Sequence, residues 1–152
     1  MDDEKKKVKN SIRFWPKYER PRELFLEKGP DYVSDAGLIA ILLRSGTKGK
    51  KVVYLDKANT ILEVVTIARG TVDQASIYPR EVIKSAINKN ASAVIFVHNH
   101  PSGCRKPSQF DIDITKKLIS ACEAVDITPL DHIIITSHGH ISLKSKGLFE
   151  TS

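Results

Sequence analysis

The sequence predicts an α/β domain, in which helices pack on a mixed β-sheet, together with a short N-terminal helical segment. Apolar residues at helical spacing alternate with short β-branched stretches, in the order helix, helix, strand, strand, helix, strand, helix, strand, strand. One strand is apolar throughout, which is typical of a strand buried on both faces of a sheet. The 152 residues are 41% apolar and 28% charged, as expected for one globular domain.

The N-terminal third divides into an arm and a helical segment. Residues 1–19 are predicted to form a basic flexible arm. Residues 20–50 form the helical segment. Within it, residues 20–45 are a predicted helical hairpin, in which Pro21 suits the first turn and Gly29 the end of the first helix. The polar stretch that closes this segment marks the boundary with the main domain, residues 51–152.

The main domain is predicted to contain five strands and two helices. The strands are residues 52–55, 61–67, 93–97, 132–136 and 140–143, and the helices are residues 79–88 and 108–125. Each helix should turn one apolar face inward. These faces consist of Val82, Ile83, Ala86 and Ile87 in the first helix, and of Ile112, Leu118, Ile119 and Cys122 in the second.

The charge distribution, the cysteine content and the apolar runs limit the partners and the cellular compartment that the sequence predicts. The net charge is +6, of which +4 lies in residues 1–22, so contact with nucleic acid through the arm is open but weakly supported. Cys104 and Cys122 are too few for a disulfide framework and suit free thiols in a reducing compartment. No apolar run reaches membrane-spanning length and no leader pattern is present, which predicts a cytoplasmic protein without membrane contact.

The candidate chemistry lies at the end of the apolar strand. His98 and His100 are two residues apart, so their side chains share one face of the strand. Pro101 and Gly103 turn the chain toward the next helix, whose first turn contains Asp111. Two imidazoles and one carboxylate with an open fourth position are typical of catalytic zinc, which lowers the pKa of bound water to about 7. We therefore predict Zn²⁺ on His98, His100 and Asp111.

Other interpretations of these residues stay open. Ser108 and Asp111, three residues apart, also fit a helix capping box. In the second His-x-His pair, His138 and His140 flank a glycine that predicts an exposed hairpin turn without a metal role. His132 suits a structural hydrogen-bonding residue better than a ligand.

The motif resembles a known family. The stretch His98-Asn99-His100-Pro101-Ser102-Gly103, followed by Ser108-Gln109-Phe110-Asp111, is similar to the JAMM metalloproteases (MPN or JAB domains). Tyr78-Pro79-Arg80-Glu81-Val82 and Leu130-Asp131-His132-Ile133-Ile134 resemble the bacterial RadC-like branch, and the resemblance covers residues 51 to 149. It implies a three-layer, cytidine-deaminase-like fold, zinc on the three predicted ligands, and Ser108 as a catalytic residue that stabilises an oxyanion.

Two departures from the family pattern affect function. Longer members carry a helix-hairpin-helix segment before the metalloprotease domain, and this chain lacks its motif, which weakens a DNA-binding role. The family's general-base glutamate should fall near Lys48, and an ammonium group is not a base at neutral pH. Glu63 and Glu81 are the nearest substitutes, although each fits a structural role. Cys104 is close enough in sequence to act as a further zinc ligand, or is an exposed loop thiol.

Two functional hypotheses follow. The first is a zinc-dependent metallopeptidase-type hydrolase of the RadC-like family, in which zinc-bound water attacks a peptide or isopeptide bond of a substrate that the sequence does not identify. The second is a catalytically weak or inactive zinc-binding module that acts in DNA repair-related or protein–protein contacts. The intact ligand set and Ser108 favour the first hypothesis, and the missing glutamate favours the second.

Overall fold

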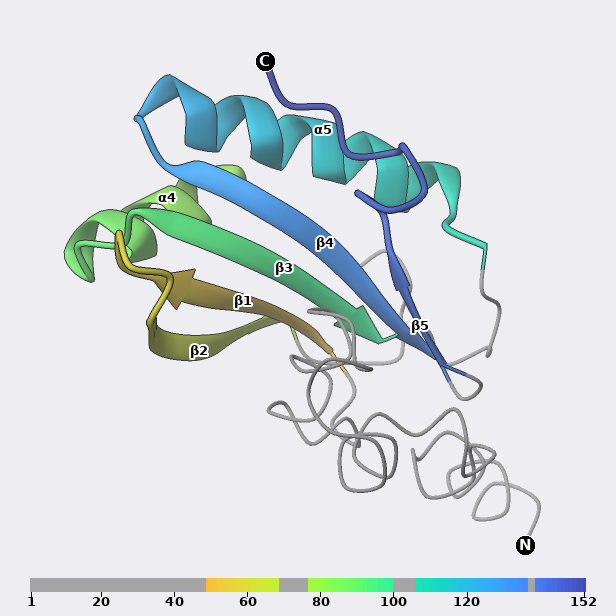
Figure 1. Ribbon diagram of the computed structural model, residues 1–152, viewed down its shortest axis with the longest axis horizontal. Coiled ribbons are helices and arrows are strands. Elements are labelled where there is room, and N and C mark those ends of the chain that lie inside the picture. Colours follow the sequence, from red (N-terminus) through yellow and green to blue (C-terminus); the bar gives the residue numbers. More distant parts are fainter. Residues whose placement is uncertain (1–48, 69–76, 100–105, 137–138) are drawn as a thin grey trace, which may run out of the picture.

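The computed structural model describes residues 49–68, 77–99, 106–136 and 139–152 (Figure 1). The predicted arm and the helical hairpin before residue 49 lie outside these ranges. Lys50, which was assigned to the helical segment, is the first residue of a strand.

A five-stranded mixed sheet forms the centre of the described structure. The strand order is β2-β1-β3-β4-β5. Strands β3 and β4 run parallel and the other neighbouring pairs are antiparallel, so the predicted mixed sheet is confirmed. The strands are β1 (Lys50–Leu55), β2 (Ile61–Ala68), β3 (Ala93–Asn99), β4 (Thr128–Thr136) and β5 (Gly139–Ser142).

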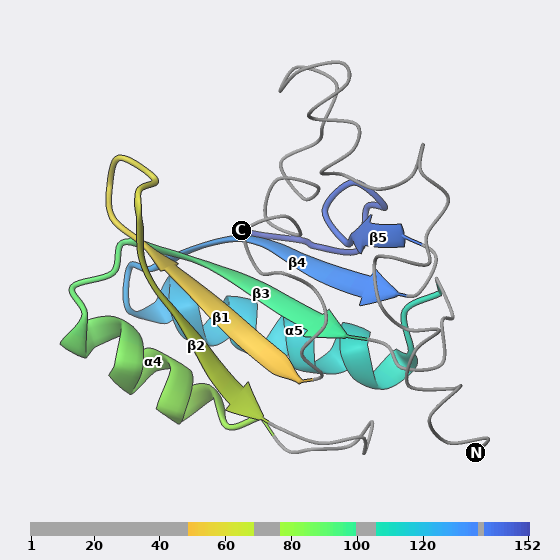
Figure 2. The same ribbon diagram turned by 90° about the horizontal axis from the view of Figure 1, so that it is seen from below.

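Both described helices, α4 (Pro79–Asn88) and α5 (Gln109–Ala124), lie on the same face of this sheet (Figures 1 and 2). Their apolar residues pack on the side chains that alternate strand positions turn toward them. This cluster includes Val82 and Ala86 of α4, Leu118, Ile119 and Cys122 of α5, and Val52, Tyr54, Val94, Phe96 and Ile134 of the sheet. A second buried cluster on the opposite face contains Val53, Leu55, Ala93, Ile95, Val97, Ile133 and Ile135. Sheet and helices thus form two of the three expected layers.

Local signals explain the helix bounds. Helix α4 begins at Pro79, whose fixed φ suits the first helical position. It ends before Asn90, which adopts φ 53°, a conformation that asparagine tolerates better than most residues. Helix α5 begins after Ser108, whose side chain accepts a hydrogen bond from the backbone of Asp111. The predicted helix over 79–88 is confirmed at both ends.

The structure differs from the predicted elements in β4, which begins at Thr128 instead of residue 132. The added residues include Pro129, which pairs with Val94 of β3 although proline cannot donate a hydrogen bond to the ladder. The sheet accommodates it beside a register shift between Val94 and Ile95 of β3, where the ladder is already interrupted.

Three side chains are also placed differently from the prediction. Ile87 was expected to face inward and is 57% exposed in the last turn of α4. Ile112 is half-buried and Ile114 takes its place in the core. His140, expected to be exposed, is half-buried in β5 opposite Ile135. In the described ranges, no helix combines the length and the apolarity that crossing a membrane requires.

Candidate functional site

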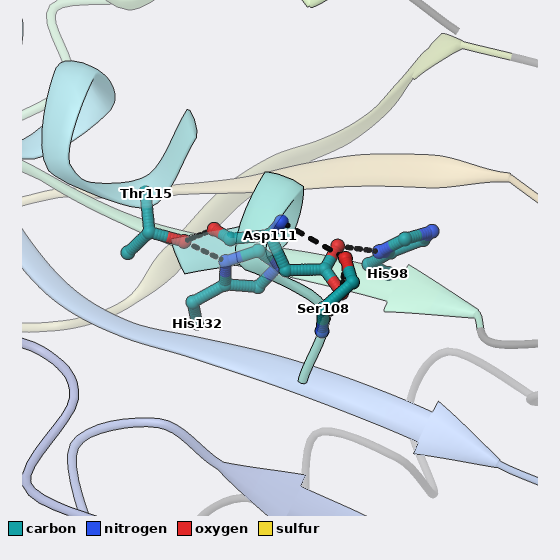
Figure 3. A network of polar contacts seen from close by, with 5 residues as sticks. All are labelled: His98, Ser108, Asp111, Thr115 and His132. Carbon is teal, nitrogen blue, oxygen red and sulfur yellow. Dashed lines mark hydrogen bonds and ion pairs between the residues drawn. The ribbon is translucent and has the colours of Figure 1, made fainter. Parts of the chain in front are cut away.

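The end of β3 and the start of α5 bring an imidazole and a carboxylate into contact. His98 is on the helix side of β3 and is 6% exposed, and Asp111, in the first turn of α5, is 1% exposed. His98 Nδ1 lies 2.9 Å from Asp111 Oδ1 (Figure 3). Because a carboxylate only accepts hydrogen bonds, Nδ1 carries the hydrogen, and in neutral His98 the lone pair is on Nε2. A metal-binding histidine commonly donates its other ring N–H to a carboxylate in this way.

Ser108 fixes the orientation of the same carboxylate. Its hydroxyl donates to Asp111 Oδ2 at 2.8 Å, and its backbone N–H donates to the same oxygen at 3.0 Å. In return, the backbone N–H of Asp111 donates to Ser108 Oγ at 3.1 Å. The capping box is therefore confirmed, and Asp111 contacts His98 while it caps the helix. The single hydrogen of the Ser108 hydroxyl is already engaged with Asp111.

The donor set of this pair fits a zinc ion. Imidazole nitrogen and carboxylate oxygen both bind zinc at 2.0–2.2 Å, so two ligands of a tetrahedral ion lie about 3.3 Å apart. The observed 2.9 Å between His98 Nδ1 and Asp111 Oδ1 would have to open by about 0.4 Å for both atoms to bind one ion. Alternatively, His98 Nε2 would bind the ion while Asp111 orients the ring.

The third predicted ligand is His100, and the sequence left Cys104 open as a further ligand. His100 and Cys104 lie outside the described residues. Within the described ranges, no group of three or more His, Cys, Asp or Glu side chains is placed to hold a metal ion.

A small cavity borders the His98–Asp111 pair. Its volume is about 10 Å³, close to what one water molecule requires. The polar residues that line it are Lys50, Lys51, His98, Asp111 and His132. Burial lowers the pKa of Lys51. This cavity contacts the two described members of the predicted ligand set.

Lys50 is a site residue that sequence reasoning missed. It is 5% exposed and lies opposite His98 in the β1–β3 register. Its ammonium nitrogen is 4.8 Å from the ring centroid of Phe110, in the first turn of α5, a distance typical of a cation–π contact. The register between distant strands is needed to place it there, and the local sequence does not contain that information.

The candidate substitutes for the missing glutamate lie elsewhere. Glu63 forms an ion pair with Lys89 at 2.9 Å, and in β2 it is opposite Tyr54, near the far end of β1 from Lys50. Glu81 is exposed and lies 3.7 Å from Arg80. Of the described residues, Asp111 is the one carboxylate that lines the cavity. The sequence from residue 36 to residue 55 also contains no Asp or Glu.

His132 has the structural role that the sequence suggested. It is 3% exposed, and its Nδ1 lies 2.6 Å from the hydroxyl of Thr115 in α5 (Figure 3). Its ring also lies 6.4 Å, centroid to centroid, from the ring of His98. The hydrogen bond was expected, but the proximity to the candidate site was not.

The fold and the strand-end His–Asp pair agree with a sequence comparison. Residues 41–148 match the family described as the RadC-like JAB domain. The match covers more than half of the chain, and this chain belongs to the RadC-like JAB domain family.

Three curated relatives support this assignment. The chain is 50% identical over 101 residues to a UPF0758 protein of Ruegeria pomeroyi, covering 66% of this chain and 45% of the relative. It is 50% identical over 97 residues to a UPF0758 protein of Pseudoalteromonas translucida, covering 64% and 43%. The matched part of this chain thus spans less than half the length of each of these two curated relatives.

A third relative bears on the missing segment. A UPF0758 protein of Nitrosospira multiformis is 30% identical over 222 residues, which cover 91% of this chain and 99% of the relative. That alignment exceeds the 152 residues of this chain by 70, so at least 70 positions of the relative have no counterpart here. The difference is consistent with the absence of an internal segment.

Proposed function

We propose that this chain is a zinc-dependent hydrolase of the metallopeptidase type, which cleaves a peptide or isopeptide bond and holds its metal with His98, His100 and Asp111. The observation that carries the proposal is the buried contact of 2.9 Å between His98 and Asp111 at the junction of β3 and α5. Membership of the RadC-like JAB domain family supports it.

The described residues would prepare this site for a metal ion. Ser108 and His98 hold both oxygens of Asp111 in place, which lowers the entropy that metal binding would cost. Zinc would supply Lewis-acid activation of water and of the substrate carbonyl. To stabilise an oxyanion, the Ser108 hydroxyl would have to turn from Asp111 Oδ2 toward the substrate oxygen.

The second candidate is a zinc-binding module with little or no hydrolysis, acting through protein or DNA repair-related contacts. The observation in its favour is the composition of the cavity, in which a buried ammonium, Lys50, accompanies a single described carboxylate, Asp111. Loss of a general base typically lowers a rate by about 10²–10⁴-fold.

Metal analysis tests the shared part of both candidates. Purified wild-type protein should hold one zinc per chain, and His98→Ala and Asp111→Asn should hold much less. His140→Ala is the matched control, because it removes a histidine from β5 outside the predicted ligand set. Wild-type protein that binds no zinc at saturating concentration would contradict both candidates.

Hydrolysis separates the two candidates. The zinc-loaded protein is incubated with a quenched fluorescent peptide library and with isopeptide-linked peptide pairs. Cleavage that a chelator abolishes, and that zinc restores in wild type but not in Asp111→Asn, supports the hydrolase. Bound zinc without cleavage, together with salt-dependent binding of duplex DNA through the basic arm, supports the second candidate.

A further inference from the structure

We propose that His132 is a positioning residue of the candidate metal site, which acts on Asp111 through the hydroxyl of Thr115. The inference rests on the proposed function for the identity of the site. The hydrogen bonds that carry it belong to the protein alone and can be tested without metal.

The hydrogen bonds have one consistent direction. The Thr115 hydroxyl lies 2.5 Å from the backbone carbonyl oxygen of Asp111 and 2.6 Å from His132 Nδ1. A carbonyl oxygen only accepts, so the single hydroxyl hydrogen of Thr115 is donated to Asp111. Thr115 must therefore accept from His132, whose Nδ1 carries a hydrogen. The result is a series of two hydrogen bonds, in which His132 donates to Thr115 and Thr115 donates to Asp111. Figure 3 shows the three residues and the contacts between them.

Burial strengthens this series of hydrogen bonds. Thr115 is fully buried, and His132 and Asp111 are almost so. In such surroundings hydrogen bonds strengthen one another, and a lost partner leaves a costly unpaired group. Phe96 packs edge-on against the His132 ring with centroids 6.2 Å apart, and it is also the partner of His132 in the β3–β4 register. The imidazole is thus held between sheet and helix.

The geometry shows which part of the protein the hydrogen bonds from His132 to Asp111 hold in place. Ser108 and His98 hold the carboxylate of Asp111, and Thr115 and His132 hold its backbone carbonyl. His132 belongs to β4, whereas His98 belongs to the parallel neighbour β3. The hydrogen bonds from His132 through Thr115 to Asp111 therefore fix the first turns of α5 relative to the sheet, so that Asp111 faces His98. Both histidines donate through Nδ1, and both line the same cavity.

Two substitutions separate this role from a general packing role. In His132→Asn the side-chain amide places an N–H near the position of Nδ1, and in His132→Gln near the position of Nε2. The proposal predicts that Asn retains the hydrogen bond to Thr115 and that Gln loses it. At Thr115, serine retains the hydroxyl, and valine removes it at nearly constant volume.

The first measurement uses metal-free protein. Nitrogen-15 NMR should show His132 with its hydrogen on Nδ1, and a hydrogen-bonded Nδ1–H resonance for His98. The His98 resonance should persist in His132→Asn and Thr115→Ser, and should shift or exchange rapidly in His132→Gln and Thr115→Val. A His132 hydrogen on Nε2 alone, or an unchanged His98 resonance in all four variants, would overturn the proposal.

The second measurement is Co²⁺ titration followed by the visible absorption of the bound ion. We expect His132→Gln and Thr115→Val to bind about tenfold more weakly than wild type with an altered spectrum, and His132→Asn and Thr115→Ser to stay close to wild type. Ile119→Val is the control, since it truncates the same core without a polar contact and should lower stability alone.

The outcomes distinguish this proposal from the proposed function. If wild-type protein binds no Co²⁺ or Zn²⁺, the zinc site is wrong, and the His98 resonance in metal-free protein still decides whether His132 positions Asp111. If metal binds equally to all four variants, the positioning role is wrong while the zinc site stands.

Discussion

The carboxylate of Asp111 accepts hydrogen bonds from His98, which belongs to β3, and from Ser108, the N-cap residue of α5. Asp111→Asn should destabilise even metal-free protein, because the amide keeps one acceptor oxygen and points N–H groups at donors. We expect a loss of about 1–3 kcal/mol in the free energy of unfolding, measured by urea denaturation with chelator present. Asp113→Asn is the matched control, an exposed carboxylate two residues away that bonds Gln109, and it should change stability by less than about 0.5 kcal/mol.

Lys50 gives a second prediction at the scale of single residues. A buried ammonium beside the cavity should oppose a divalent cation, so Lys50→Met should raise zinc affinity by about tenfold or more. Competitive titration against a chelating dye measures the change, with exposed Lys57→Met as control. Unchanged or weaker affinity in Lys50→Met would show that the ammonium does not act on the metal.

The local sequence could predict part of this site and not the rest. His98 and Asp111 are 13 residues apart, at the end of β3 and the start of α5, so their contact could be expected from the local sequence. Lys50 and His132 reach the cavity through the pairings of β1 with β3 and of β3 with β4. A single sequence does not specify these registers, because they depend on how the whole sheet packs.

At the scale of elements, Asp131 connects β4 to the segment that follows β5. Its carboxylate accepts from the backbone N–H groups of His132 and Lys144 and from the Ser142 hydroxyl. Asp131→Ala should therefore cost about 1–3 kcal/mol and increase amide hydrogen exchange in β5 more than in β1. Equal exchange in both strands would contradict this local role. Glu150→Ala, which removes an exposed carboxylate, serves as the comparison.

Helices were easier to predict than strands for a physical reason. The bounds of α4 and α5 depend on neighbouring residues such as Pro79 and Ser108, which satisfy or pre-organise the first turn. The start of β4 depends on a partner strand, since Pro129 pairs with Val94 next to the register shift in the ladder with β3.

At the scale of the whole molecule, pH should act through the core between β1 and α5. Desolvation raises the pKa of Cys122 from 9.0 to about 11, and burial raises that of Tyr54 above 10.0. Both groups are neutral when protonated, so their raised pKa values give stability that is complete below pH 9 and lost as pH rises toward 11. Lys51 acts in the opposite direction, because its lowered pKa favours folding as pH rises.

Thermal unfolding between pH 8 and 10.5 measures this balance. We expect the melting temperature of the wild type to fall in this range, and the fall to be smaller in Cys122→Ala, although that variant is less stable at pH 8. An identical slope in both proteins would show that the thiol does not contribute. Cys122 should also resist alkylation at pH 8 until the protein unfolds, because it is buried and protonated.

The candidate site is assembled within one strand–helix–strand unit. His98 ends β3, Asp111 and Thr115 belong to α5, and His132 belongs to β4. The two parallel strands can pair only after the crossover helix has closed the loop between them, which is a slow, non-local step in folding. The site should therefore be absent from the denatured ensemble and be complete only after the rate-limiting transition state. A ligand that requires the finished site would slow unfolding and leave the refolding rate almost unchanged.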